Sequence, residues 1–191
     1  AENANIRIGD TVVVFAQGPI GLCATAGARL LGATTIIAVD GNDHRLGIAQ
    51  KMGADVTLNF KNCDVIDEIM KITGGRGADS AIEALGTQAT FESALRSIKP
   101  GGTLSSLGVY SEDLKIPLSA FAAGLGDHKI NTALCPGGKE RMRRLMNVLA
   151  SNRLDLGLLV THQYKLDDIV AAYDLFAHQR DGVLKVAIKP Q

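Results

Sequence analysis

The chain has 191 residues, of which 46% are hydrophobic and 21% are charged, a composition typical of a globular protein with one sizeable core. Lysine plus arginine and aspartate plus glutamate number 20 each, so the net charge is zero, which excludes strong electrostatic attraction to nucleic acid or membrane surfaces. No apolar run reaches the roughly 18 residues of a membrane span, and no signal sequence stands at the start. We therefore expect a cytoplasmic protein without nucleic-acid or membrane partners.

The cysteines and histidines do not form a metal-binding pattern. The three cysteines, Cys23, Cys63 and Cys135, are widely spaced without a CxxC pair, which argues against both a disulfide framework and a zinc knot. The four histidines are also scattered. We expect no metal site made by this chain alone, and we interpret Cys23 as a small buried hydrophobe inside a helix.

The most informative pattern comes early in the chain. Thr11 to Phe15 is a β-branched and aromatic run of strand length, Ala16 to Gly21 is a glycine-bearing corner, and Pro19 to Leu31 has apolar residues at helical spacing. A second apolar strand, Thr35 to Val39, is followed by Asp40. Strand, glycine corner, helix, strand and acid is the order in which a Rossmann unit is built around a dinucleotide.

The glycine corner has the residue types that an anion site at a helix N-terminus needs. Gly18 has no Cβ, so a pyrophosphate can approach the backbone, and Pro19 suits a first helical turn, where no N–H is required. Gly21 lets the helix press against the strand. Asp40 follows Gly18 by 22 residues, close to the spacing of about 20 expected for the acid that accepts hydrogen bonds from the adenosine ribose. Ala16 replaces the first glycine of the fingerprint and is strained if that position needs a positive φ.

A simpler interpretation of the same residues stays open. Gly18 and Gly21 would then serve only close packing in a βαβ unit, and Asp40 would be a solvated acid at a strand end. The strand before the corner, the helix after it and the spacing of the acid favour the dinucleotide interpretation.

The alternation continues after the first unit. The expected helices are 44–52, capped by Asp43, 65–72, capped by Asp64, 88–98, capped by Thr87, and then 137–149 and 169–176. The expected strands are 56–59, 78–84, 103–107, 129–134 and 183–188, with 111–126 as a loop and a short apolar turn. This order predicts an α/β, Rossmann-type doubly wound parallel sheet of about six strands with helices on both faces, in a single domain of residues 1–191 that includes a C-terminal helix-strand segment.

Several longer stretches are more specific than the glycine corner. They are GDTVVVFAQGPIGL, the VD that ends the second strand, KMGAD, IEALGTQATFESALRSIKPGGTLSSLGVYS, LCPGGKERMRRL, LVTH and DGVLKVAIKP. On these stretches, nearly end to end, the chain resembles the coenzyme-binding domain and C-terminal segment of a medium-chain zinc-dependent alcohol dehydrogenase. LCPGGKERMRRL is particularly similar to the tetrameric secondary-alcohol dehydrogenases of bacteria, and with an uncovered apolar edge this makes a homo-oligomer an expectation.

The resemblance implies a role for each matched position. The positions that would bind the pyrophosphate are Gly18, Pro19, Ile20 and Gly21. Those expected around the adenosine are Asp40, on the ribose hydroxyls, with Gly41, Asn42, Arg45 and Phe60. Those expected to line the nicotinamide through backbone groups are Leu85, Gly86, Leu107, Gly108 and Val109. Lys185 matches a cofactor-contacting lysine in some relatives, and a solvated strand-edge lysine is the alternative.

The resemblance also implies what this chain does not carry. In the family, zinc is bound by a cysteine, a histidine and an acid on a preceding domain, and none of those motifs occurs in the 191 residues. We therefore expect no catalytic or metal residues here, with zinc bound outside this chain in the full-length enzyme. Because a carboxylate at Asp40 repels a 2′-phosphate, NAD is the expected cofactor. Hydride would pass between nicotinamide and an alcohol or carbonyl carbon, and the chain alone would be inactive.

Three alternatives stay open from the sequence. The first is a stand-alone dinucleotide-binding module without chemistry. The second is the cofactor domain of a zinc-independent quinone reductase relative, which LCPGGKERMRRL disfavours. The third is a structural protein that kept the fold, for which Ala16 is mild support.

Overall fold

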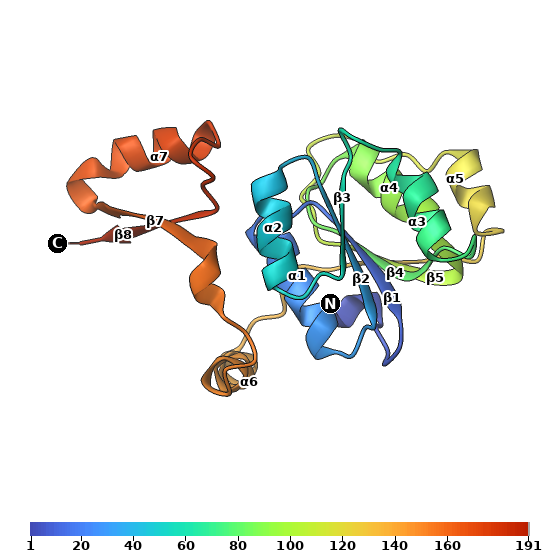
Figure 1. The fold of residues 1–191 in the computed structure, drawn as a ribbon, viewed down its shortest axis with the longest axis horizontal. Helices are drawn as coiled ribbons and strands as arrows, with labels where there is room; N and C mark the ends of the chain where they lie inside the picture. Colours follow the sequence, from blue (N-terminus) through green and yellow to red (C-terminus); the bar gives the residue numbers. More distant parts are fainter. Residues whose placement is uncertain (191) are drawn as a thin grey trace. The chain divides into compact units, whose positions relative to one another are not determined.

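The computed structural model describes residues 1–190 and divides into two compact units, which we describe separately. The first unit runs from Ala1 to Arg141, and the second begins at Met142. Figure 1 shows the course of the chain through both. That both units belong to one dinucleotide-binding domain stays a prediction.

The first unit is organised around a six-stranded sheet in the order β3-β2-β1-β4-β5-β6. Every neighbouring pair of strands is parallel. The chain runs outward from β1 to β3, returns to the other side of β1, and runs outward again to β6, which is the doubly wound order. The strands are β1 (Thr11–Phe15), β2 (Thr35–Asp40), β3 (Val56–Asn59), β4 (Ala78–Glu83), β5 (Ile98–Ser106) and β6 (Lys129–Thr132). The predicted fold class is confirmed.

Helices cover both faces of this sheet (Figure 1). One face carries α1 (Pro19–Leu30) and α2 (Asp43–Lys51), and the other carries α3 (Val65–Ile72), α4 (Gln88–Ser97) and α5 (Leu118–Ala123). Right-handed crossovers place successive helices on one face while the chain moves outward in one direction, and on the opposite face after it reverses. A short 3₁₀ helix, Glu2–Ala4, precedes β1.

Burial explains why the central strands read as continuous apolar runs. Val12, Val13 and Val14 of β1 and Ile36 and Ile37 of β2 are all 0% exposed, because helices cover both faces of the sheet. A strand with only one buried face would alternate apolar and polar residues instead. The core of the first unit therefore lies around β1, the strand at which the winding direction reverses.

Side-chain caps define the starts of three helices. Asp64 and Thr87 are the N-caps of α3 and α4, as predicted. The Asp64 carboxylate accepts from backbone N–H groups of the first turn of α3, and Thr87 also forms a capping box with Thr90, which was not predicted. The prediction for α2 was wrong, since the cap is Asn42, whose side-chain oxygen accepts from His44 N and Arg45 N. Asp43 instead lies in the first turn, and its Oδ1 accepts from Asn59 Nδ2 at 2.6 Å.

Three further expectations differ from the structure. β5 begins at Ile98 rather than Thr103, because the chain extends directly from α4 and pairs Ile98 with Ala78 of β4 before a register shift. The expected apolar turn within 111–126 contains α5. Cys23 is exposed rather than buried, because it faces away from the sheet side of α1.

The second unit is smaller. It holds most of α6 (Lys139–Ala150), two 3₁₀ helices (Leu156–Leu159 and Leu166–Asp168), β7 (Val160–Lys165), α7 (Ile169–Ala177) and β8 (Lys185–Lys189). β7 and β8 form a two-stranded parallel sheet, a strand pairing that the sequence did not predict. Ala172 of α7 and Val183 and Leu184 before β8 are buried.

Candidate functional site

The carboxyl ends of β1, β2, β4 and β5 are tied together by backbone hydrogen bonds. Ala16 N donates to Val39 O at 2.9 Å, Ala84 N to Phe15 O at 3.1 Å, and Leu107 N to Glu83 O at 2.8 Å. In a doubly wound sheet, ligands bind outside these strand ends, at the point where the strand order reverses. Here that point lies between β1 and β4.

The turn between β1 and α1 is strained and closely packed. Ala16 has φ 68°, in the left-handed region. From the sequence, backbone strain at Ala16 is expected if this position has a positive φ, and that strain is present. A Cβ on Gly21 would stand 1.8 Å from the Ala16 carbonyl oxygen, so only glycine lets α1 approach the turn this closely. The packing role predicted for Gly21 is therefore found, and it depends on the carbonyl orientation that Ala16 adopts.

The N-terminus of α1 is open. Gly18 is the N-cap, in extended conformation at φ −69° and ψ −178°, and no side chain caps the first turn. Pro19 occupies the first helical turn, and a Cβ placed on Gly18 would meet no atom within 4 Å. Uncapped N–H groups and the positive end of the helix dipole favour an anion here, and the open space beside Gly18 lets one approach.

Asp40 is an anchored carboxylate. It is 8% exposed, its Oδ2 accepts from Gln17 N at 2.6 Å, and its Oδ1 accepts from Asn42 N at 2.9 Å. These bonds exclude the alternative of a freely solvated acid at a strand end. Each carboxylate oxygen has a second lone-pair direction, so Asp40 keeps acceptor capacity for two neighbouring hydroxyl groups.

Gln17 is a structural residue that the sequence did not single out. It is fully buried, donates from Nε2 to Val14 O at 2.9 Å, and accepts at Oε1 from Thr25 Oγ1 at 3.0 Å. Its backbone N–H holds Asp40, so the turn after β1 and the acid after β2 are fixed to each other. A polar residue between an apolar strand and an apolar helix was the available signal.

The residues predicted around the adenosine gather beside Asp40. A Cβ on Gly41 would be 2.5 Å from Phe60 Cζ, so the Phe60 ring lies directly against this glycine. Phe60 N donates to Asp40 O at 3.3 Å, and its side chain is 58% exposed. Asn42 caps α2, and Arg45 lies in its first turn. A flat apolar ring with a free face next to an anchored acid suits a planar base attached to a sugar.

The loops after β4 and β5 touch each other at glycines. A Cβ on Gly108 would lie 2.2 Å from Gly86 N, and a Cβ on Gly86 would lie 2.5 Å from Val109 O. Gly86 has φ 96°, which also favours glycine. Leu85 and Val109 are exposed, so the two loops present an apolar surface at the same edge as Gly18. The five positions predicted for this part of the site, which include Leu107, lie in these two loops.

Glu83, the last residue of β4, was not predicted as a site residue. It is fully buried, and its Oε1 accepts from Leu85 N at 2.8 Å, Gly86 N at 2.7 Å and Thr90 Oγ1 at 2.8 Å. Burial alone raises the pKa of Glu83, but the hydrogen bonds, led by those from Gly86 and Leu85, outweigh burial and hold the pKa below its ordinary value. An acid at the end of an apolar strand was the sequence signal.

One predicted residue lies in the second unit. Lys185 is the first residue of β8, and its side chain is exposed. Its role toward a cofactor stays a prediction.

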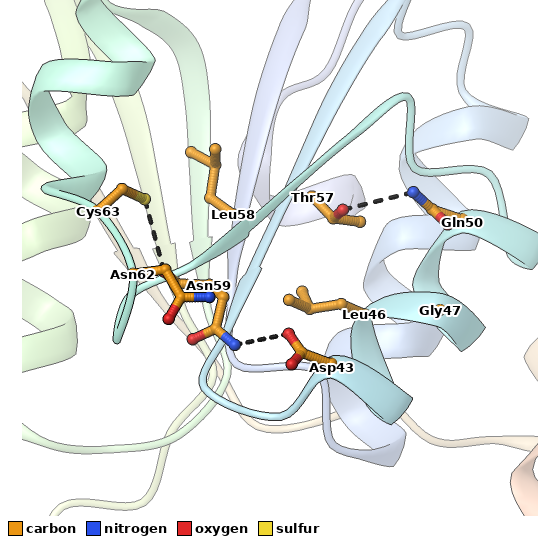
Figure 2. Close-up of a pocket in the computed structure, with 9 residues that line it drawn as sticks. All are labelled: Asp43, Leu46, Gly47, Gln50, Thr57, Leu58, Asn59, Asn62 and Cys63. Atoms are coloured by element: carbon orange, nitrogen blue, oxygen red, sulfur yellow. Dashed lines mark hydrogen bonds between the residues drawn. The ribbon is translucent and has the colours of Figure 1, made fainter.

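A separate cavity of about 440 Å³ lies at the outer edge of the sheet, between α2 and β3 (Figure 2). Asp43, Gln50, Asn59 and Cys63 are among its lining residues, with Asn59 Nδ2 donating to Asp43 Oδ1 at 2.6 Å. None of the predicted site residues lines it. The cavity is therefore separate from the cluster around Gly18 and Asp40.

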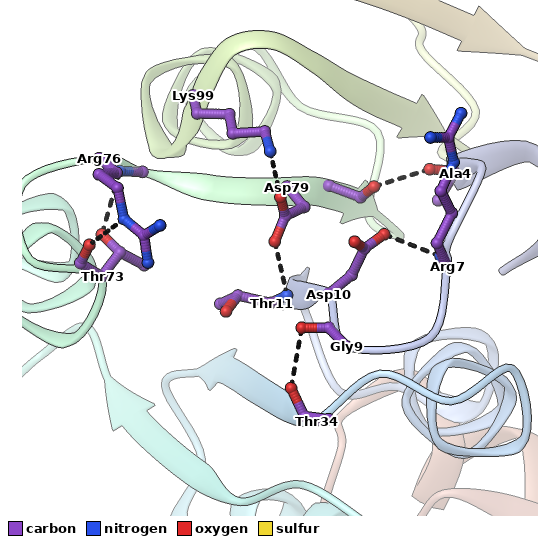
Figure 3. Close-up of polar contacts among 12 residues, drawn as sticks. Ala4, Arg7, Gly9, Asp10, Thr11, Thr34, Thr73, Arg76, Asp79 and Lys99 are labelled. Carbon is purple, nitrogen blue, oxygen red and sulfur yellow. Dashed lines mark hydrogen bonds and ion pairs between the residues drawn. The ribbon is translucent and has the colours of Figure 1, made fainter.

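The amino ends of β1, β4 and β5 are joined by polar contacts (Figure 3). Asp79 Oδ2 accepts from Thr11 N at 2.8 Å, Asp79 Oδ1 forms an ion pair with Lys99, and Ser80 Oγ donates to Ala4 O at 2.7 Å. Burial alone raises the pKa of Asp79, but the bonds from Lys99 and Thr11 lower it below its ordinary value. These contacts tie the amino ends of β1, β4 and β5 together. The uncapped N-terminus of α1 lies at the other end of the strands, beside their carboxyl ends.

Two features are absent from the part of the chain that the structure describes. Within residues 1–190, no group of three or more histidine, cysteine, aspartate or glutamate side chains is arranged to hold a metal ion. In the same range, no helix has the length and apolarity needed to cross a membrane.

Comparison with known proteins decides the family. Residues 19–151, from the N-terminus of α1 to just beyond the end of α6, match the family model described as zinc-binding dehydrogenase. The chain belongs to the zinc-binding dehydrogenase family. The matched range contains the glycine turn from Pro19 onward, Asp40, and both loops that meet at Gly86 and Gly108, so the family assignment covers nearly the whole candidate site.

Curated relatives of the chain agree with this family assignment. An alcohol dehydrogenase of Cupriavidus necator is 85% identical over 190 residues, which cover all of this chain and 52% of that protein. An NADP-dependent isopropanol dehydrogenase of Entamoeba histolytica is 36% identical, covering 99% of this chain and 52% of that protein. The chain spans about half the length of the curated relatives it matches.

Solved structures show the same fold. The alcohol dehydrogenase TADH from Thermus sp. ATN1 superposes with a TM-score of 0.87 at 30% identity, over 98% of this chain and 54% of that one. An oxidoreductase/dehydrogenase of unknown specificity from Escherichia coli superposes with a TM-score of 0.91 at 26% identity, over 99% and 54%. The predicted resemblance to zinc-dependent alcohol dehydrogenases is confirmed.

Proposed function

We propose that this chain is the NAD-binding part of an alcohol dehydrogenase and that it holds the nicotinamide in place for hydride transfer. The observation that supports this most strongly is the uncapped N-terminus of α1 at Gly18, fixed through Gln17 to the anchored carboxylate of Asp40. An anion site and a diol acceptor in one rigid unit match the pyrophosphate and ribose of a dinucleotide.

Different residues bind different parts of the cofactor in this proposal. The first turn of α1, at Pro19 to Gly21, offers backbone N–H groups to the pyrophosphate, with Gly18 leaving room for its approach. Asp40 accepts from the adenosine ribose, and Phe60 packs against the base. When bound, the nicotinamide supplies a carbon that accepts or donates hydride. The apolar loops at Leu85 and Val109 keep water from its ring and fix which face is available to substrate.

The family name implies zinc, and the described residues do not fit it. Because no metal-binding group occurs within residues 1–190, we assign the zinc to a part of the enzyme outside this chain. We expect the chain alone not to oxidise alcohol. A single domain over residues 1–191, a cofactor contact at Lys185, a cytoplasmic location and self-association belong to the same proposal. They follow from composition and from the family resemblance.

The preference for NAD over NADP rests on Asp40. Its carboxylate is held by Gln17 N and Asn42 N. In the proposed binding mode it would face the 2′-phosphate of NADP, and the two negative charges would repel each other. Two of the curated relatives matched at 36% identity are named as NADP-dependent, so the choice of cofactor is a property to test in this chain.

The test is a titration of the wild-type chain and of Asp40→Gly with NADH and NADPH. Isothermal calorimetry measures the affinities, and thermal denaturation measures the melting temperatures. NADH is expected to raise the melting temperature of the wild type. Asp40→Gly is expected to bind NADH about tenfold to hundredfold more weakly, because charged hydrogen bonds to the ribose are lost, and to bind NADPH better than the wild type does.

Asp43→Asn is the matched control, because it removes an exposed carboxylate three residues further on without touching Gln17 or Asn42. It is expected to leave the ratio of the two affinities unchanged. NADH binding by Asp40→Gly that equals the wild type would remove the role assigned to this acid.

A further inference from the structure

Glu83 is a buried carboxylate between two loops rather than within one. Its Oε1 receives three hydrogen bonds, from Leu85 N, Gly86 N and Thr90 Oγ1, which fix the first residues after β4 and the first turn of α4. A fully buried charge is stable only when it is hydrogen-bonded on all sides, so this carboxylate depends on the geometry of the loop that surrounds it. Gly86, which has φ 96°, is one of the residues whose backbone N–H donates to that carboxylate.

The other oxygen of Glu83 reaches the loop after β5. Oε2 accepts from Tyr110 OH at 2.8 Å, and Ser106 Oγ, which lies 3.3 Å from the same oxygen, is hydrogen-bonded to Tyr110 OH at 2.6 Å. Burial first, and then the neighbouring carboxylate, raise the pKa of Tyr110 to about 12, so this hydroxyl keeps its proton and acts as the donor. The Tyr110 ring packs edge-on against Phe91 of α4, with centroids 6.2 Å apart, which fixes its position independently of the hydroxyl.

The two loops that Glu83 joins are also in direct contact. The backbone of Gly86 lies against Gly108 and Val109 so closely that a Cβ on either glycine would overlap the other loop. Neither loop can shift without changing a hydrogen bond to Glu83 or this contact. One carboxylate therefore determines the relative position of both loops at the carboxyl edge of the sheet.

We infer that Glu83 is a positioning residue for the nicotinamide half of the cofactor and that the hydrogen bond from Tyr110 links Glu83 to the loop after β5. The inference rests on the proposed function, because the surface formed by Leu85, Gly86, Gly108 and Val109 is the one assigned to the nicotinamide. Glu83 is separated from the cofactor by these loops and touches no reacting atom. Its effect is confined to the nicotinamide end, since the pyrophosphate and ribose sites depend on Gly18, Gln17 and Asp40 instead.

The test compares NADH with ADP-ribose, a probe that has the same pyrophosphate and adenosine but no nicotinamide. The full 191-residue chain is prepared as wild type, Glu83→Ala, Glu83→Gln and Tyr110→Phe, and both affinities are measured by calorimetry. Glu83→Ala is expected to lose about tenfold in NADH affinity, the effect of one lost charge-assisted hydrogen bond, with less than about a twofold change for ADP-ribose. The fluorescence lifetime of bound NADH reports the nicotinamide environment directly and is expected to shorten.

The conservative variant separates positioning from charge. Glu83→Gln keeps an oxygen that accepts from Leu85 N and Gly86 N, and the hydroxyls of Ser106 and Tyr110 can rotate to accept from its amide. It is therefore expected to restore most of the NADH affinity that Glu83→Ala loses. Glu92→Gln, a partly buried carboxylate of α4 in an ion pair with Arg96, is the matched control and is expected to change neither affinity.

Each outcome decides the inference. Equal losses of NADH and ADP-ribose affinity in Glu83→Ala would show a general structural role and overturn it. Should Glu83→Ala fail to fold, Tyr110→Phe removes one donor and keeps the ring contact with Phe91, and an unchanged ratio of the two affinities in that variant would overturn the inference as well. If the wild type binds neither NADH nor ADP-ribose, the proposed function itself is refuted. That result is distinct from a loss of affinity in a variant alone.

Discussion

Replacing Gly21 by alanine tests the closest contact in the candidate site. The new Cβ would stand 1.8 Å from Ala16 O and 2.9 Å from Ala16 C, whereas folded proteins essentially never place a Cβ within 3.0 Å of a heavy atom of a residue that is not its chain neighbour. The turn and α1 must therefore separate by more than an ångström. Overpacking of this kind costs about 1–3 kcal/mol, occasionally more, and the better helix propensity of alanine returns about 1 kcal/mol at most.

We expect Gly21→Ala to destabilise the chain by about 2 kcal/mol, which for a protein of this size lowers the melting temperature by roughly 4–8 °C. Circular dichroism during thermal and urea denaturation measures both quantities. NADH affinity is expected to fall as well, since the movement of the turn displaces Gln17 and with it the bond from Gln17 N to Asp40.

Gly47→Ala is the matched control for this prediction. Gly47 also lies inside a helix, α2, and a Cβ there would meet no atom within 4 Å. This substitution is expected to raise stability by about 0.5–1 kcal/mol, because alanine costs less conformational entropy in a helix. A melting temperature of Gly21→Ala that rises along with that of Gly47→Ala would refute the argument from the contact with Ala16.

Two further predictions concern strain and pH. Ala16→Gly should stabilise the chain by up to about 1 kcal/mol, because relief of the left-handed backbone at φ 68° exceeds the added entropy of the unfolded glycine, and a lower urea midpoint would contradict this. The pKa of Glu83 is lower in the folded chain than its ordinary value of about 4.5, so this carboxylate stabilises the fold above about pH 4.5 and ceases to do so as the pH falls through its folded pKa. The free-energy difference between wild type and Glu83→Gln should therefore narrow in acid, and urea denaturation that gave the same difference at about pH 3.5 and about pH 7 would disprove it.

Local sequence patterns were sufficient for most elements of the first unit. Apolar runs of strand length alternate with helical periodicity from Thr11 onward, and glycines or caps such as Asp64 and Thr87 mark the boundaries. These signals depend only on residues a few positions apart, and this is why they can be read without a structure. With the right-handed crossover rule they predicted a parallel sheet covered on both faces, whereas the strand order itself came from the structure.

The errors occurred where distant residues compete with local preference. Asp43 and Asn42 are both good N-caps, and the choice between them depended on Asn59, 16 positions away from Asp43, which binds its carboxylate. The early start of β5 at Ile98 depends on pairing with Ala78 of the neighbouring strand. No local pattern contains that information.

For this protein the sequence alone determined the identity of the elements, the glycine turn with its acid, and the family resemblance, because each depends on residues close together in the chain or on long matched segments. Only the tertiary structure decided that Ala16 is strained, that Asp40 is anchored by Gln17, and that Glu83 joins two loops. Each of these depends on atoms brought together across as many as 27 positions of the chain, as with Glu83 and Tyr110. Burial then makes such contacts strong, because in the interior a carboxylate has no water to replace a missing partner.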